Sequence, residues 1–249
     1  MSLVGAKEVK SHPKAQSCSQ LQSYRQSHQD DATQADLMSE PLILVDRQDK
    51  VLGSASKLAA HRAPGALHRA FSVLLFNQAG ELLIQQRAGS KITFPGCWAN
   101  TCCSHPHYHK GELESHNARG VKLAAIRKLH HELGISESVL SEDDFILMTK
   151  VLYRADSECE WVEEELDYIL IVRADVELSI NANEVSQTRW VTPEQLSQLL
   201  EVSDRNNQHR VAPWFRLISE HFLFRWWRVL DNPEALEKES DREIHRFIS

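Results

Sequence analysis

The residues best suited to chemistry lie in KITFPGCWANTCCSHP, residues 91–106, which contains two adjacent thiols and a histidine. If the second half of this segment is extended, alternation places Thr101, Cys103 and His105 on one face. Cys102 then faces the opposite side. A thiol beside an imidazole or a metal can be held as a thiolate, which acts as a nucleophile or a proton carrier. The alternative is that both thiols are small apolar groups in a core strand.

Two further histidines flank the segment HRAPGALH, residues 61–68. Pro64 and Gly65 break any helix there, so we expect His61 and His68 in a loop that folds both imidazoles toward one point. A single histidine is weak evidence for a site, because most histidines lie at the surface or in satisfied core positions.

Two carboxylates alternate in EWVEEELDYIL, residues 160–170. In a strand, Glu163 and Glu165 share one face while Glu164 points away. Inward carboxylates must be paired, protonated or bound to a cation, since burial of a bare charge is costly. The alternative is an exposed edge on which all three glutamates are solvated.

Three imidazoles and two carboxylates would form a closed metal site suited to octahedral Mn²⁺, Zn²⁺ or Mg²⁺. Its candidate ligands are His61, His68, His105, Glu163 and Glu165. A metal there would orient and tune a carboxylate that also does proton chemistry.

The composition of the 249 residues is that of a soluble globular protein, with 42% hydrophobic and 25% charged residues. A net charge of −7 argues against a general nucleic-acid binder. The apolar runs are too short to span a membrane and no secretory signal is present, so we expect no membrane partner. Five cysteines without a disulfide spacing indicate a reducing compartment. We expect a cytoplasmic monomer, with a peroxisomal or other organellar location left open.

Residues 1–38 are rich in Ser, Gln, Lys and Asp, which predicts a disordered polar leader before one domain over residues 39–249. The patterns predict strands at 42–46, 71–76, 81–87, 145–153, 161–172 and near Trp190. They predict helices at 112–134, beginning within 112–120, at 193–201 and at 214–230. The strands 71–76 and 81–87 are expected to pair as a hairpin.

Four motifs together resemble the type I isopentenyl-diphosphate delta-isomerase family, which has a Nudix fold. They are LHRAFSVLLFN, FPGCWANTCCSHP, EWVEEELDYIL and APWF, and the resemblance covers residues 41–249. It implies an α+β protein: a Nudix-like α/β/α sandwich with a mixed β-sheet, an N-terminal β-hairpin extension and C-terminal helices. It also implies interconversion of isopentenyl and dimethylallyl diphosphate by an antarafacial [1,3] proton transfer through a tertiary carbocation.

The resemblance assigns roles to particular residues. Cys103 and Glu165 would stand on opposite faces of the substrate, and Tyr153 would donate a hydrogen bond to Glu165. Trp214 would lay its ring near the cationic carbon, where a desolvated cation gains on the order of 2 kcal/mol. The family's metal ligands fall on the same three histidines and two glutamates that the spacing selects.

The resemblance also implies a diphosphate site. Its contacts would come from Lys57, Arg87, Lys91, Ser104 and Lys128. A second Mg²⁺, bridging the diphosphate, would be held by Glu132. Lys128 stands where relatives carry arginine, so the charge is kept and the bidentate fork is lost.

The segment RKLHHELG, residues 127–134, resembles a degenerate Nudix box. Lys128 and His131 occupy positions where Nudix hydrolases carry glutamates for catalytic Mg²⁺, so only Glu132 of that set remains. This departure favours an isomerase. The alternatives are a Nudix-type pyrophosphohydrolase and a catalytically inactive paralogue with a binding role.

Overall fold

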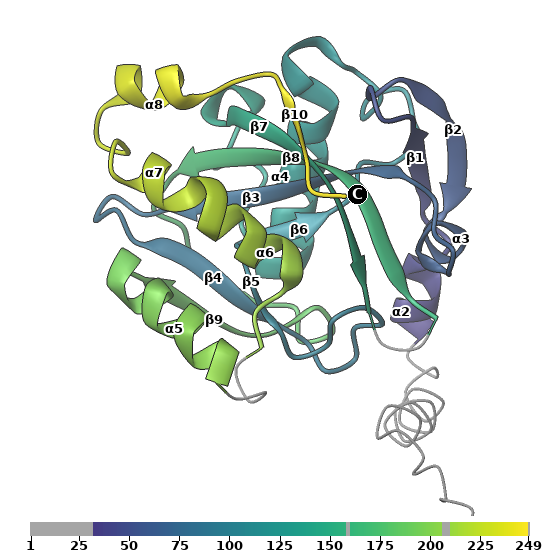
Figure 1. Cartoon of the computed structure of the whole chain (residues 1–249), viewed down its shortest axis with the longest axis horizontal. Helices are drawn as coiled ribbons and strands as arrows, with labels where there is room; N and C mark the ends of the chain where they lie inside the picture. The colour runs from purple at the N-terminus through teal and green to yellow at the C-terminus, as the bar shows by residue number, and fades with distance from the viewer. Residues whose placement is uncertain (1–31, 158–159, 206–209, 249) are drawn as a thin grey trace, which may run out of the picture.

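The structure is a computed structural model and describes residues 32–157, 160–205 and 210–248 (Figure 1). Its strands are β1 (Pro41–Val45), β2 (Val51–Ser56), β3 (His68–Phe76), β4 (Leu82–Arg87), β5 (Trp98–Ala99), β6 (Cys102–Ser104), β7 (Ile146–Asp156), β8 (Val162–Arg173), β9 (Val185–Val191) and β10 (Ile244–Arg246). Its α-helices are α2 (Ala32–Leu37), α3 (Lys57–His61), α4 (Arg119–Leu133), α5 (Pro193–Arg205), α6 (Pro213–Ile218), α7 (Phe224–Trp227) and α8 (Pro233–Glu239). Shorter 3₁₀ turns lie at His116–Ala118 and Glu142–Asp144.

The strands form one mixed sheet, and β3 lies at its centre. The main path runs β10-β7-β8-β3-β1-β2, while β4 pairs with β3, β5 and β9, and β6 pairs with β3. The β3–β8 and β10–β7 pairs are parallel, and the others are antiparallel. The β1–β2 pair is the N-terminal hairpin extension that the sequence predicts.

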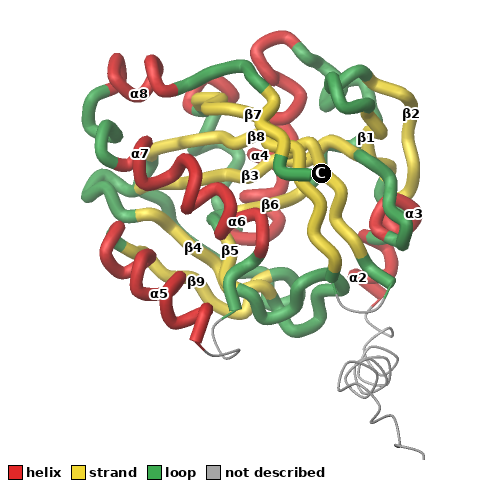
Figure 2. The backbone as a smooth tube through the Cα atoms, in the orientation of Figure 1, coloured by secondary structure: helices red, strands yellow, loops and turns green. Residues whose placement is uncertain are grey.

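Two hydrophobic cores lie on the two faces of the sheet, because the buried residues of β3 alternate between them. Leu74 and Phe76 join the core under α5, α6 and α7. Phe71 and Val73 join the core under α4. Figures 1 and 2 show α5, α6 and α7 in front of the sheet and α4 behind it. This arrangement confirms the predicted α/β/α sandwich with a mixed sheet.

The predicted hairpin of β3 and β4 has its turn, but its strands pair only at Phe76 and Leu82. Beyond that point Thr101 lies between them: Leu75 N donates to Thr101 Oγ1 (2.9 Å), which donates to Leu83 O (2.6 Å). The strands therefore separate. Residues 98–104 enter the gap, first as β5 beside β4 and then as β6 beside β3.

Other expectations need correction. His61 ends helix α3 and His68 begins β3, so only the residues between them form the predicted loop. The helix predicted over 214–230 is interrupted by a π-helical segment at Ser219–Leu223 between α6 and α7.

The predicted leader also differs in part. Residues 1–31 lie outside the described residues, but residues 32–37 form helix α2. A side chain of this helix, Gln34, is buried and donates to Asn183 O (2.9 Å) and to Glu184 Oε1 (3.0 Å). These long-range bonds hold α2 to the body of the protein, which the polar composition alone did not indicate. The division at residue 38 stays a prediction.

The patterns did not predict α8 and β10, which follow the C-terminal helices. β10 pairs in parallel with β7 and extends the sheet at its edge. Within the described ranges, no helix is both long enough and apolar enough to cross a membrane.

Candidate active site

Three site residues lie in a row across β3, β8 and β7, and strand register places them there. His68 pairs with Glu165 in the parallel β3–β8 ladder, and Glu165 pairs with Tyr153 in the antiparallel β7–β8 ladder. All three side chains are buried. The Tyr153 hydroxyl donates to Glu165 Oε2 at 2.5 Å, as the resemblance implies.

Three imidazoles surround the other oxygen of the same carboxylate. Glu165 Oε1 lies 2.9 Å from His105 Nε2, 3.5 Å from His68 Nε2 and 3.8 Å from His61 Nε2. The Nδ1 atom of His61 lies 2.9 Å from Lys57 O, and that of His68 lies 2.7 Å from Ala66 O. Those carbonyls can only accept, so Nδ1 carries the proton in both rings and each Nε2 presents a lone pair.

The group fits a divalent cation. Lone pairs of neutral imidazoles and a carboxylate oxygen all accept, and His68 Nε2 is buried without a hydrogen-bond partner. Burial lowers the pKa of His61 to about 4, despite Glu165, and burial likewise lowers the pKa of His105, so both rings are held neutral. Ligand atoms of His61, His68, His105 and Glu165 all lie within 4.8 Å of one another. Glu163 lies outside this group, so the structure brings together four of the five expected metal ligands.

The two buried glutamates differ in their electrostatics. Burial and the negative charge of Glu165 raise the pKa of Glu163 to about 7. Burial also disfavours ionisation of Glu165, but the adjacent imidazoles, of which His105 lies nearest at 2.9 Å, outweigh it and hold its pKa well below the usual range. The face carries one ionised carboxylate beside a second whose pKa is raised. Glu164 points away and pairs with Arg154 (3.0 Å), as alternation predicts.

The two adjacent thiols lie on opposite faces of β6. Cys102 is buried in the core under α4, whereas Cys103 lines the pocket and packs against the core under α6. The predicted choice of Cys103 as the thiol beside the site is therefore confirmed in position. Burial raises the pKa of Cys103, and the charges of Glu165, Asp167 and Glu163 raise it further. The thiol is thus protonated.

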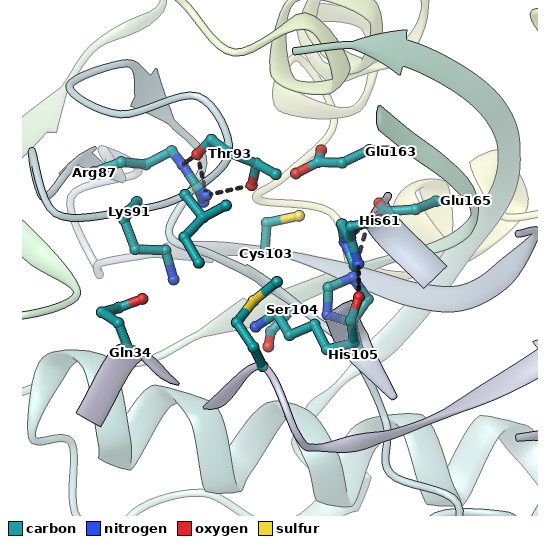
Figure 3. A pocket seen from close by; sticks show the side chains of 13 residues that line it. Gln34, His61, Arg87, Lys91, Thr93, Cys103, Ser104, His105, Glu163 and Glu165 are labelled. Carbon is teal, nitrogen blue, oxygen red and sulfur yellow. Dashed lines mark hydrogen bonds and ion pairs between the residues drawn. The ribbon is translucent and has the colours of Figure 1, made fainter. Parts of the chain in front are cut away.

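One pocket contains the thiol, the carboxylates and several cations. Its lining residues are Gln34, Met38, Lys57, His61, Arg87, Lys91, Ile92, Thr93, Cys103, Ser104, His105, Glu163 and Glu165. Figure 3 shows Arg87 and Lys91 on one side of Cys103, with Glu163 and Glu165 on the other. The pocket therefore has a basic end and a proton-transfer end.

Arg87 and Lys91 both have protein partners at the basic end. Arg87 donates to Thr93 O (2.8 Å) and Oγ1 (3.2 Å), which fixes the loop between β4 and β5. Lys91, on that loop, pairs with buried Glu184 at 2.6 Å. Lys57 reaches the same end from α3 and lies 3.7 Å from Glu40.

Lys128 and Glu132 pair with each other on helix α4. Both lie on α4, buried, with Lys128 Nζ 3.3 Å from Glu132 Oε1 and 3.0 Å from His131 Nδ1. Glu132 also accepts a hydrogen bond from Gln85 (3.1 Å), and neither residue lines the pocket. Glu132 lies toward Cys102, on the α4 side of β6. Their roles in diphosphate and Mg²⁺ binding stay predictions.

Trp214 lies behind the pocket and is not part of its lining. Its ring faces the Arg87 guanidinium, 5.4 Å from the centroid, and meets Phe94 edge to face. Its Nε1 donates to Asn100 Oδ1 at 3.0 Å. The ring thus contacts a residue of the basic end, and its expected contact with a carbocation stays a prediction.

Sequence reasoning missed several polar residues of the site. Asp167 continues the alternation of Glu163 and Glu165, so the same period of two could have found it; its Oδ2 accepts from Ser72 at 2.8 Å. Glu184 carried no local signal, because its contact with Lys91 joins residues far apart in the chain. Gln34 was missed because it lies in a polar N-terminal segment, where one more polar residue gives no signal.

Comparisons with known proteins agree with this geometry. The Nudix domain family model matches residues 66–215. The Isopentenyl-diphosphate Delta-isomerase I of Camptotheca acuminata is 44% identical over 225 residues, 88% of this chain and 96% of that protein. The Isopentenyl-diphosphate Delta-isomerase of Dictyostelium discoideum is 46% identical over 222 residues, 86% of this chain and 92% of that protein. The Isopentenyl-diphosphate Delta-isomerase II, chloroplastic, of Arabidopsis thaliana is 43% identical over 224 residues, 87% of this chain and 79% of that protein.

Among solved structures, DR0079 from Deinococcus radiodurans superposes with a TM-score of 0.50 at 20% identity, covering 74% of this chain and all of that one. At this identity the likeness shows the fold alone. The sandwich and the matching family model define a Nudix-domain protein. Within that class, the chain belongs to the isopentenyl-diphosphate Delta-isomerase family.

Proposed function

We propose that the protein interconverts isopentenyl diphosphate and dimethylallyl diphosphate, with Cys103 and Glu165 as the proton-transfer residues. The observation that carries the proposal is that the Cys103 thiol and the Glu163–Glu165 pair line one pocket whose other end is basic. Such a pocket suits a short hydrocarbon joined to a diphosphate.

The isomerisation moves one proton onto the alkene and removes another. In one direction, the Cys103 thiol gives its proton to one end of the allylic unit and a carboxylate accepts a proton from the other end. The double bond shifts by one carbon, and the positive charge lies on the tertiary carbon in between. In the reverse direction the two groups exchange roles. General acid and base groups of this kind contribute about 10²–10⁴-fold each.

The neighbours of Glu165 support this role. Tyr153 donates to one oxygen and His105 lies against the other, so the carboxylate is fixed in one orientation. Orientation matters because a proton is transferred only over hydrogen-bond distances. We assign Tyr153 as the residue that positions Glu165, and we propose that the Trp214 ring stabilises the cationic carbon.

The four-residue group around Glu165 would hold one divalent ion. The imidazole donors favour Mn²⁺ or Zn²⁺ over Mg²⁺, which prefers oxygen ligands. When bound, the ion would supply positive charge that stabilises the Glu165 carboxylate and keeps it oriented. We further propose that Mg²⁺ accompanies the diphosphate, with Glu132 as its protein ligand.

The diphosphate would be bound by the cations of the basic end. Lys57, Arg87 and Lys91 line the pocket, and Ser104 contributes a hydroxyl. The partners Glu40 and Glu184 neutralise two of these cations. A diphosphate that competes with these carboxylates gains charge-assisted hydrogen bonds, which are stronger than neutral ones. Lys128, paired with Glu132, would act with the Mg²⁺ ion.

We propose the cytoplasm as the location. The alternative is an organelle, which the name of the Arabidopsis relative supports for that protein. We propose a monomer.

Incubation with isopentenyl diphosphate and Mg²⁺ in deuterated water tests the proposed reaction. We expect dimethylallyl diphosphate carrying deuterium, because a solvent-derived proton enters the alkene. Release of phosphate or pyrophosphate without labelled product would instead identify a hydrolase. Recovery of unlabelled substrate with tight binding would identify a binding protein.

A further inference from the structure

A second group of metal-ligating side chains lies outside the proposed active site. Residues 105–112 read HPHYHKGE, in which His105 belongs to the buried group around Glu165. The next two alternate histidines, His107 and His109, meet Glu112 instead, and their ligand atoms all lie within 4.8 Å of one another. Neither the pocket nor the proposed isomerisation uses these three side chains.

The distance between His109 and Glu112 matches the ligand spacing around a zinc ion, and the ligand atoms of all three residues lie within 4.8 Å of one another. Zn–N and Zn–O distances of about 2.0–2.2 Å in a tetrahedral site place two ligand atoms about 3.4 Å apart. His109 Nε2 lies 3.3 Å from Glu112 Oε1, longer than the usual hydrogen bond of this kind. An ion could therefore replace the shared proton without a large movement of either side chain.

Glu112 is held in place before any ion binds. Its carboxylate is buried, and Arg127 donates to both oxygens, at 2.7 Å to Oε1 and 3.0 Å to Oε2. His107 N donates to Oε2 as well. Each carboxylate oxygen has two lone pairs, so on Oε1 one accepts from Arg127 and the other faces His109. Gly120 permits this packing, because a Cβ there would collide with the Glu112 carbonyl.

His107 is also oriented by a carboxylate. Its Nε2 lies 3.3 Å from Glu40 Oε1, and the ring is half-buried. A carboxylate beside a ligating histidine fixes the ring and raises its basicity, and loss of such a partner costs about 10–100-fold in metal affinity. Together with Glu112, Glu40 provides a second negative charge near a cation bound between His107 and Glu112.

We propose that His107, His109 and Glu112 form a second divalent-metal site, of the Zn²⁺ class, separate from the His61–His68–His105–Glu165 group. Two imidazoles and one carboxylate select a borderline transition ion over Mg²⁺ or Ca²⁺, which favour all-oxygen sites. One coordination position stays open to water, because His109 is 53% exposed at the rim. One side chain connects the two sites: Arg127, which holds Glu112, also donates to His105 O at 3.3 Å.

Equilibrium dialysis of the metal-stripped full chain against buffered free Zn²⁺, followed by metal analysis, tests the site. The readout is the difference between the wild type and His109→Asn, so it does not depend on how much Zn²⁺ the buried group binds. The His109 side chain is exposed, so we expect the substitution to leave the fold intact. His116→Asn, also exposed and nearby in the chain, is the matched control.

We expect the wild type and His116→Asn to bind one more equivalent of Zn²⁺ than His109→Asn. In His109→Asn, we expect the affinity of the second site for Zn²⁺ to be lower by about 100-fold or more. Excess Mg²⁺ should leave the difference unchanged. Equal Zn²⁺ content in the wild type and His109→Asn overturns the proposal. Equal loss in His116→Asn also overturns it, since the extra ion would then be bound non-specifically by surface histidines.

Discussion

Tyr153 and Glu165 are direct partners in the β7–β8 ladder, and the Tyr153 hydroxyl donates to Glu165 Oε2 at 2.5 Å. Both side chains are buried, and the other oxygen of Glu165 faces His105 at 2.9 Å. The carboxylate is therefore held from two sides, by Tyr153 on β7 and by His105 directly after β6. Its orientation depends on the strand register, so a change in either neighbour should affect the reaction more than the fold.

Replacement of Tyr153 by Phe removes this hydrogen bond and keeps the ring. A hydrogen bond to a charged group contributes about 1.5–3 kcal/mol, so we expect kcat to fall about 10- to 100-fold with little change in KM. Tyr168→Phe is the control, because its hydroxyl contacts Asp49 in a separate cluster. A larger loss of kcat in Tyr168→Phe than in Tyr153→Phe would contradict the assigned role.

The two thiols provide a matched pair of variants. Cys103→Ala removes the proposed proton carrier, and we expect kcat to fall at least about 10²–10⁴-fold. Cys102→Ala removes a buried sulfur on the opposite face, and we expect near-normal kcat with a stability loss of about 1 kcal/mol. Steady-state kinetics and thermal unfolding of both variants check this. Equal kinetic losses in the two variants would show that the faces of β6 are wrongly assigned.

Titration of Lys57 should produce a decrease at high pH, a basic limb, in the pH profile of kcat/KM. Burial, followed by the nearby charge of Lys91, lowers the pKa of Lys57 to about 8. As the pH rises through that value the side chain loses its charge, so kcat/KM for the diphosphate substrate should fall above about pH 8. The pH profile of kcat/KM reports groups of the free enzyme, which makes it the suitable measurement.

Lys57→Arg tests the origin of that limb. Arginine stays charged over the whole accessible range, so the limb should move to higher pH even if the affinity itself drops. Lys110→Arg, at an exposed position between His109 and Glu112, is the control and should leave the limb in place. An unmoved limb in Lys57→Arg would assign it to another group.

Removal of the ion from the buried His/Glu group should lower both activity and stability. At a metal concentration about 100-fold above Kd, binding to the folded state adds about 2.7 kcal/mol, which corresponds to about 5–10 °C in Tm for a chain of this size. The His109→Asn background isolates this effect from the second site. Thermal unfolding with and without chelator provides the measurement. An unchanged Tm together with full activity in chelator would remove the metal from the proposed mechanism.

Local alternation predicted a large part of the site. It separated Cys103 from Cys102, and Glu163 and Glu165 from Glu164, because each set lies within a single strand where side chains alternate. The structure confirms both separations. Local patterns also predicted helix α4 and its end at Gly134, which has φ 68°.

Long-range pairing lay beyond these patterns. The parallel register that sets His68 beside Glu165 joins strands far apart in the chain, and nothing in either strand specifies it. The Lys91–Glu184 pair is hidden for the same reason. The charge state of Cys103 was also beyond the sequence, because spacing identified only the imidazole nearby, whereas burial and three carboxylates raise the pKa of the thiol.

The separation of β3 from β4 around Thr101 has a consequence for how the protein could change over evolution. The thiol enters the site from inside the sheet, on a segment held between two strands, whereas Lys91 comes from a loop and Lys57 from a short helix. The reacting thiol is thus held within the sheet, whereas two of the proposed anion-binding residues, Lys57 and Lys91, lie outside it. Variants that accept a longer or differently charged substrate should therefore arise in residues 88–97 and in α3, with β6 left intact.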